Sequence, residues 1–159
     1  MQDAFLKIKD IKGESVDDKH KDEIDVLAWS WGASQSGTTH MGPGGGAGKV
    51  AVQDMSISKY VDKASPVLFK SCCNGKHFGE AILTVRKAGE KPVEYYKVTM
   101  TDLLITSVSG GDSAGSDRMV ENITLNFAKV KIEYVPQKAD GSADATVEAG
   151  WDIAANKEM

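Results

Sequence analysis

Residues 24–49 read IDVLAWSWGASQSGTTHMGPGGGAGK and join a strand-like run to the most glycine-dense loop of the chain. From Leu27 to Gly32 the large apolar residues hold odd positions and the small ones even positions, which is the two-residue period of a strand with one buried face. The other face carries Ala28 and Ser30, and it lacks the charges of an ordinary solvent-facing surface. We therefore expect this face to lie against a neighbouring subunit, a cavity wall or a ligand.

Length and charge limit the possible classes of protein. A chain of 159 residues fits one domain, spanning residues 1–159, and is long enough to bury a core without disulfide or metal support. The net charge of -4 gives no basic footprint for nucleic acid or for an anionic membrane surface. Neither is an expected partner.

The N-terminal run MQDAFLKIKDIKGE alternates apolar with charged residues. It has no basic leader followed by an apolar stretch, so a Sec-type signal peptide is not expected. The chain also lacks an apolar run of the roughly 20 residues that cross a bilayer. These features predict a protein that folds in the cytoplasm without inserting into a membrane, and they leave open export by a route that reads no N-terminal signal.

The rest of the chain is mostly strand-like. Apolar alternation predicts strands at 4–9, 24–32, 50–61, 80–86, 93–107, 121–134 and 146–153. One short helix is expected over 62–75, with Asp62 or Ser65 as its cap, Pro66 in its first turn and Gly75 as its stop. Seven or eight strands with one flanking helix predict an all-β barrel or sandwich.

Two further patterns concern strand geometry and loops. The apolar phase of 121–134 slips by one residue at Ala128–Lys129, which predicts a β-bulge that bends the strand. Residues 13–23 are charged and have no period, so they are predicted to be a solvated loop. Residues 109–117 are glycine- and serine-rich, so an exposed loop is predicted there as well.

The glycine-rich loop does not match a phosphate-binding loop. A Walker A sequence requires glycine where this chain has Pro43 and serine or threonine where it has Val50, and it leads into a helix rather than a strand. Ordering a loop so rich in glycine costs much conformational entropy. A useful role for such a loop is to become ordered when it contacts a partner. It is a candidate intermolecular contact, made of Thr38, Thr39, His40, Met41, Gly42, Pro43, Gly44, Gly45, Gly46, Ala47 and Gly48.

No catalytic constellation is evident in the sequence. His20, His40 and His77 have no nucleophile at a recognisable spacing. The acid pairs Asp17–Asp18 and Asp22–Glu23 lie in a polar segment and are expected to be solvated. We therefore expect neither enzymatic activity nor a cofactor.

The two cysteines, Cys72 and Cys73, are adjacent in sequence. A disulfide between neighbours requires a strained ring, and a zinc site with His77 would lack a fourth ligand. Two reduced, buried thiols are expected.

Several longer segments together resemble one family. They are EIDVLAWSWGASQSG (23–37), HMGPGGGAGKV (40–50), VQDMSISKYVDKASP (52–66), GKHF (75–78), RKAGE (86–90) and ENITLNFAKVKIEYVPQKADG (121–141). In this order, and over essentially the whole chain, they resemble the haemolysin-coregulated protein family, the tube subunits of bacterial type VI secretion.

The resemblance implies a β-barrel of two sheets with one flanking helix, similar to phage tail-tube proteins. It also implies homohexameric rings that stack into a tube, a sheath and a spike or baseplate as partners, and small effector proteins bound in the ring. Alternatives are a monomeric ligand-binding β-barrel and a secreted effector. In a ring, Ala28 and Ser30 are expected to face the lumen or, equally, a subunit interface, and residues 38–48 to contact the next ring or subunit.

Overall fold

The computed structural model describes residues 2–37, 48–89 and 92–159. It contains eleven strands and one helix within these ranges. The strands are β1 (Gln2–Ile8), β2 (Ile24–Val26), β3 (Ala28–Ser30), β4 (Ala33–Ser34), β5 (Ala51–Val52), β6 (Met55–Tyr60), β7 (His77–Lys87), β8 (Glu94–Gly111), β9 (Val120–Tyr134), β10 (Val147–Asp152) and β11 (Lys157–Glu158), and the helix is α1 (Ser65–Asn74). The prediction of a mostly β fold with one short helix is confirmed.

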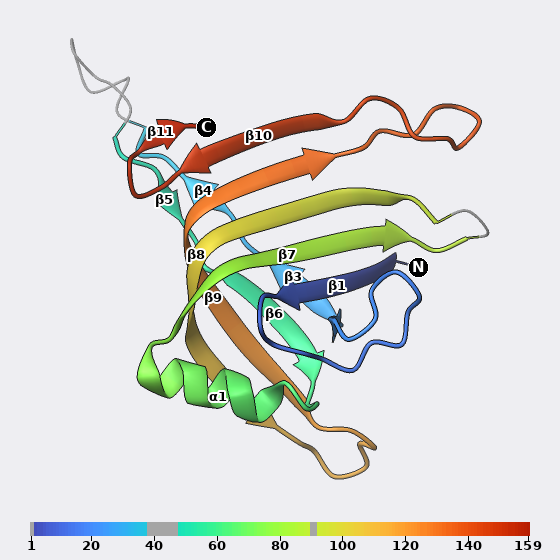
Figure 1. Cartoon of the computed structure of the whole chain (residues 1–159), viewed down its shortest axis with the longest axis vertical. Coiled ribbons are helices and arrows are strands. Elements are labelled where there is room, and N and C mark those ends of the chain that lie inside the picture. The colour runs from blue at the N-terminus through green and yellow to red at the C-terminus, as the bar shows by residue number, and fades with distance from the viewer. Residues whose placement is uncertain (1, 38–47, 90–91) are drawn as a thin grey trace.

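β4 and β5 pair as a separate two-stranded sheet, and the other nine strands form one antiparallel sheet that folds over on itself (Figure 1). Its main order is β11-β10-β9-β8-β7-β1-β2, and β6 pairs with the first part of β9 while β3 pairs with β6. One layer contains β2, β1, β7 and β10 together with the first part of β8 and the last part of β9. The other layer contains β3 and β6 together with the last part of β8 and the first part of β9. The two layers match the expected barrel of two sheets, and the sheet is not closed by hydrogen bonds within the described residues.

The three longest strands bend together along one line. Gly79 of β7, Asp102 of β8 and Ala128 of β9 lie opposite one another, because the pairs on both sides of this line keep a constant register. On each strand the buried side chains change parity at this line. Asp102 has a left-handed φ of 58°, which an aspartate tolerates better than most residues.

The bulge predicted at Ala128–Lys129 is therefore wrong in mechanism. The apolar phase does change there, but no residue is inserted on β9, since Leu103 pairs with Phe127 and Thr101 with Lys129. The register shift of this hairpin lies on β8 instead, between Ile105 and Ser107.

The core fills the space between the layers. Its fully buried members come from both of them and include Leu6, Ile24, Met55, Ile57, Leu83, Val98, Met100, Leu103, Ile123 and Leu125. Helix α1 closes one end, where Leu68 is fully buried and the helix packs against β8 (Figure 1). Gly75 ends the helix at φ 66°, as the sequence predicted.

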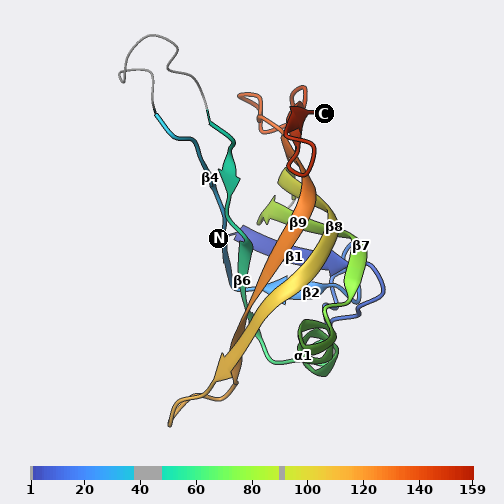
Figure 2. The ribbon, with the colours of Figure 1, turned by 90° about the vertical axis from the view of Figure 1, so that its left-hand side faces the viewer.

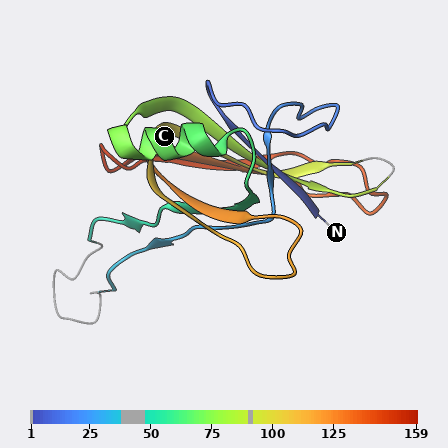
Figure 3. The ribbon, with the colours of Figure 1, turned by 90° about the horizontal axis from the view of Figure 1, so that it is seen from below.

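Residues 24–32, predicted as one strand, form two separate strands. β2 pairs with β1 in one layer, and β3 pairs with β6 in the other. The chain changes layer at Leu27, which is 49% exposed rather than in the core. Strands β4 and β5 then pair as an arm that extends away from the body, as Figures 2 and 3 show.

Candidate lumen and assembly surface

The smooth face expected on β3 is present. Ala28 and Ser30 are exposed, while Trp29 between them packs against the core and stacks on Tyr96 with ring centroids 5.5 Å apart. Trp31, beyond the strand, meets the ring of Phe127 edge-on at 6.3 Å. From Ala28 to Trp31 the alternation therefore separates core from surface as the sequence predicted, whereas Leu27 departs from it.

Strand register extends this face across four strands. Residues paired across antiparallel strands project to the same side of the sheet. One row is Ala28, Ser58, Asn122 and Ser109, and the next is Ser30, Ser56, Thr124 and Ser107. We call these eight residues the neutral face, because none of them carries a charge.

Hydroxyl groups on the neutral face bond to one another. The register shift on β8 places both Thr106 and Ser107 against Thr124, with 2.6 Å between each hydroxyl oxygen and Thr124 Oγ1. Asp54, beside the neutral face, accepts hydrogen bonds from Thr106 Oγ1 at 2.7 Å and from Asn126 Nδ2 at 2.9 Å. The surface is thus polar and internally hydrogen-bonded.

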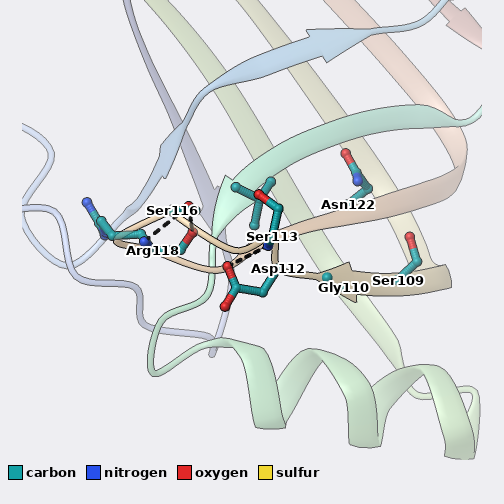
Figure 4. A pocket seen from close by; sticks show the side chains of 9 residues that line it. Ser109, Gly110, Asp112, Ser113, Ser116, Arg118 and Asn122 are labelled. Carbon is teal, nitrogen blue, oxygen red and sulfur yellow. Dashed lines mark hydrogen bonds between the residues drawn. The ribbon is translucent and has the colours of Figure 1, made fainter.

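A shallow hollow of about 400 Å³ lies at the end of the β8–β9 hairpin (Figure 4). Ser109 and Asn122 of the neutral face line it, together with Asp112, Ser116 and Arg118 of the turn. The dashed bonds in Figure 4 are local turn contacts: Asp112 Oδ1 accepts from the Ser113 amide at 2.9 Å, and Ser116 bonds with the Arg118 backbone. These groups shape the hairpin end and do not form a catalytic arrangement.

Two features were not visible in the sequence. The first is an apolar groove of about 420 Å³ between the β4–β5 arm and the β9–β10 pair, whose lining includes Trp31, Val52, Val130, Ile132 and Trp151. The second is a pair of open sheet edges: among the described residues β3 pairs with β6 alone, and β8 beyond Leu104 pairs with β9 alone. Only the pairing of distant strands reveals either one.

Most of the loop expected to make intermolecular contacts, residues 38–47, lies outside the described residues. Gly48 is exposed where the loop joins the arm, and a Cβ there would meet Ser36 Oγ at 2.5 Å. The structure therefore positions the strands that flank this loop.

The remaining reactive side chains are separate from the neutral face. Cys72 is half-buried and Cys73 exposed, both as free thiols, so the prediction that both are buried is wrong for Cys73. His77 is exposed, whereas His20 is buried against two carboxylates. Within 2–37, 48–89 and 92–159, no group of three or more His, Cys, Asp or Glu side chains is placed to hold a metal ion.

The charged segment 13–23 differs from the predicted solvated loop. Gly13, Ser15 and His20 are buried, and Asp17 is bound by Arg86 with oxygen-to-nitrogen distances of 2.7 and 3.0 Å. The guanidinium lowers the pKa of Asp17 to about 2. In the part of the chain that the structure describes, no helix is long and apolar enough to cross a membrane.

Comparisons with known proteins agree with this geometry. The family model "Type VI secretion system effector, Hcp" matches residues 5–134. The chain is 58% identical to Protein hcp1 of Pseudomonas aeruginosa over 156 residues, which covers 97% of this chain and 96% of the relative.

Two solved structures are similar over their whole length. Hcp1 from Salmonella typhimurium is 47% identical with a TM-score of 0.83, and the match covers 99% of both chains. A protein described as a type six secretion system protein is 31% identical with a TM-score of 0.94 and covers all of both chains. The chain therefore belongs to the Hcp family of type VI secretion system proteins.

Proposed function

We propose that this chain is the subunit of a homohexameric ring, that rings stack into the inner tube of a type VI secretion machine, and that small effector proteins bind in the lumen. The sheath and the spike or baseplate are the further partners of such a tube. The observation that carries the proposal is the neutral face, which spans four strands and ends at two open sheet edges.

The open edges support assembly of identical copies. An unpaired strand edge exposes backbone N–H and C=O groups that another chain can pair with. In a ring, the edge at β3 of one copy meets the edge at β8 of the next, so the neutral faces join into one continuous wall. The apolar groove beside the arm adds a surface of the kind that marks protein contacts.

The same layout disfavours a monomeric ligand-binding barrel. That function needs an open interior, and here the space between the layers is filled by side chains such as Ile57, Leu103 and Ile123, which are at most 1% exposed. The alternative of a secreted effector acting alone predicts no ring.

Native mass measurement separates these functions. A mass of six subunits at working concentration supports the ring, and a monomer contradicts it. Appearance of the protein in the medium only when the contractile machine is active supports the tube role. We propose that the chain is cytoplasmic while assembled and leaves the cell without cleavage of a signal peptide.

A substitution on β3 tests the lumen assignment. Ser30→Trp should leave the number of subunits in the ring unchanged. It should reduce co-purification of effectors, because the indole fills space at the wall of the lumen. Ser142→Trp, in the exposed turn between β9 and β10, is the matched control. Normal effector recovery with Ser30→Trp would contradict the lumen assignment, whereas loss of the ring itself would place Ser30 in a subunit interface.

We further propose that residues 38–48 contact the next ring or subunit. Shortening this loop should abolish stacking, observed by light scattering or electron microscopy, while the subunit stays folded. Each contact between rings is expected to be weak, since affinity accumulates over repeated interfaces. Tubes of normal length from the shortened variant would refute the assignment.

A further inference from the structure

His20 is a buried titratable group with no part in the proposed function. Its side chain is 9% exposed and lies between two carboxylates. Nδ1 is 2.9 Å from Glu23 Oε2, and Nε2 is 2.6 Å from Glu94 Oε1. Glu23 belongs to the same loop as His20, whereas Glu94 begins β8. The imidazole of His20 therefore joins the loop to the sheet.

The protonated form of the His20 ring satisfies both of these contacts. An ionised carboxylate only accepts hydrogen bonds, and a neutral imidazole has one donor nitrogen and one acceptor nitrogen. Only the imidazolium donates to both Glu23 and Glu94. In the neutral form, one ring nitrogen would direct its lone pair at a carboxylate oxygen.

The surroundings favour the cation further. The ring of His20 stacks on Phe5 with centroids 4.4 Å apart and 9° between the planes, a geometry that attracts a charged ring. The Arg86 guanidinium of β7 also lies over Phe5, 5.0 Å from its centroid. Arg86 is itself bound by Asp17 of the loop and Asp3 of β1.

The ion pairs of this cluster join two cations to four carboxylates. The cations are His20 and Arg86, and the carboxylates are Asp3, Asp17, Glu23 and Glu94. Because carboxylates outnumber cations even with the imidazolium present, removing its proton leaves more negative charge unbalanced in a partly buried cluster. The Asp17–Arg86 pair remains, so the change is local to the His20 side of the loop.

We propose that His20 is a proton-dependent clasp that fixes its side of the loop of residues 9–23 to β8, and that this side of the loop opens as pH rises. The clasped state binds one more proton than the open state once the free imidazole has lost its own. Raising the pH therefore favours opening, by about tenfold per pH unit in that range. The proposal does not rest on ring assembly or on effector binding.

Histidine ring NMR tests the protonation state on the whole protein, from about pH 5 to about pH 8, the range in which histidine titrates. If the imidazolium donates to both carboxylates, the ¹⁵N shifts of His20 should report two protonated ring nitrogens. Replacing each histidine in turn by asparagine assigns the signals. A neutral His20 ring throughout this range would overturn the proposal.

Hydrogen exchange, corrected for the intrinsic pH dependence of exchange, tests the opening. The loop amides of His20, Asp22 and Glu23 are hydrogen-bonded within the loop, and the helical amide of Leu68 is the reference. Protection of the loop amides should fall with rising pH while that of Leu68 does not. Equal protection of the loop at both ends of the range would contradict the clasp.

Glu94→Gln supplies the matched variant. The glutamine amide can donate to Nε2, so a neutral His20 has partners for both nitrogens and the loop no longer needs the proton. The variant should keep the loop protected and lose most of the pH dependence. If Glu94→Gln shows the parent's pH dependence, the proposal fails, and should the variant not fold, the ring NMR of the parent decides alone.

Discussion

Lys59→Met should be one of the most destabilising single substitutions in this chain. The Lys59 side chain is completely buried, and its Nζ donates to Asp62 Oδ1 at 2.9 Å, to Ser65 Oγ at 3.3 Å and to the carboxylate of Glu121. Glu121 and Asp62 are only 6% and 10% exposed. The network therefore ties β6 to β9 and to the start of α1.

Methionine keeps most of the volume of lysine and removes the charge. Two carboxylates then remain close together with little access to water, and breaking a buried pair in this way costs about 3–5 kcal/mol. The control is Lys131→Met on β9, since Lys131 is 41% exposed and 3.3 Å from Glu148. An exposed pair of this kind contributes about 0–1 kcal/mol.

Denaturant unfolding at a fixed protomer concentration measures both variants, because assembly makes apparent stability depend on concentration. We expect Lys59→Met to lower the free energy of unfolding by several kcal/mol and Lys131→Met to lower it by less than about 1 kcal/mol. Replacing Lys59 and Glu121 together by apolar residues should recover part of the loss. Equal stability of the two single variants would refute the reasoning that removing Lys59 leaves two buried carboxylates unpaired at a large cost in free energy.

Two other predictions concern the loop of residues 9–23. Gly13→Ala should cost about 1–3 kcal/mol in the same unfolding assay, because its Cβ would lie 2.5 Å from the carbonyl oxygen of Glu23, whereas Gly111→Ala meets nothing within 4 Å and should be nearly neutral. Arg86→Met should raise the pKa of Asp17 from about 2 toward its ordinary value of 3.8, observed by carboxyl ¹³C NMR. Since the folded pKa lies below the unfolded one, the contribution of Asp17 to stability is present above about pH 3.8 and is lost as pH falls toward 2, and Arg86→Met should flatten that part of the acid titration. Equal losses of unfolding free energy in Gly13→Ala and Gly111→Ala would contradict the first prediction. An unchanged titration of Asp17 in Arg86→Met would contradict the second.

Local patterns in the sequence predicted the elements well. The alternation around Trp29 and the signals at Pro66 and Gly75 each act over a few residues, and the structure has a strand and a helix there. The phase change at Ala128 also located a bend correctly. It did not reveal the mechanism, because the line through Gly79, Asp102 and Ala128 exists only once three strands are aligned.

Long-range pairing explains what the sequence could not show. His20 meets Glu94, 74 residues away, and Asp17 meets Arg86, 69 residues away. Within residues 13–23 these side chains look like the charges of any solvated loop. Their burial depends on partners from β7 and β8, and no periodicity inside the loop encodes those partners.

The neutral face also depends on pairing between distant strands, and it supplies a final test of the ring. Each of its eight small or polar residues is ordinary on its own strand, and only the strand register brings them together into rows without charge. In a closed ring every residue is repeated in each subunit, so one carboxylate on this face becomes a circle of like charges around the lumen, and its repulsion adds over all copies. Ser30→Asp should therefore weaken assembly in native mass measurements at low salt and recover with added salt, which screens the repulsion. Ser30→Asn, which has nearly the same shape as aspartate but no charge, should assemble normally. Equal assembly of the two variants at low salt would mean that this face does not enclose a common space.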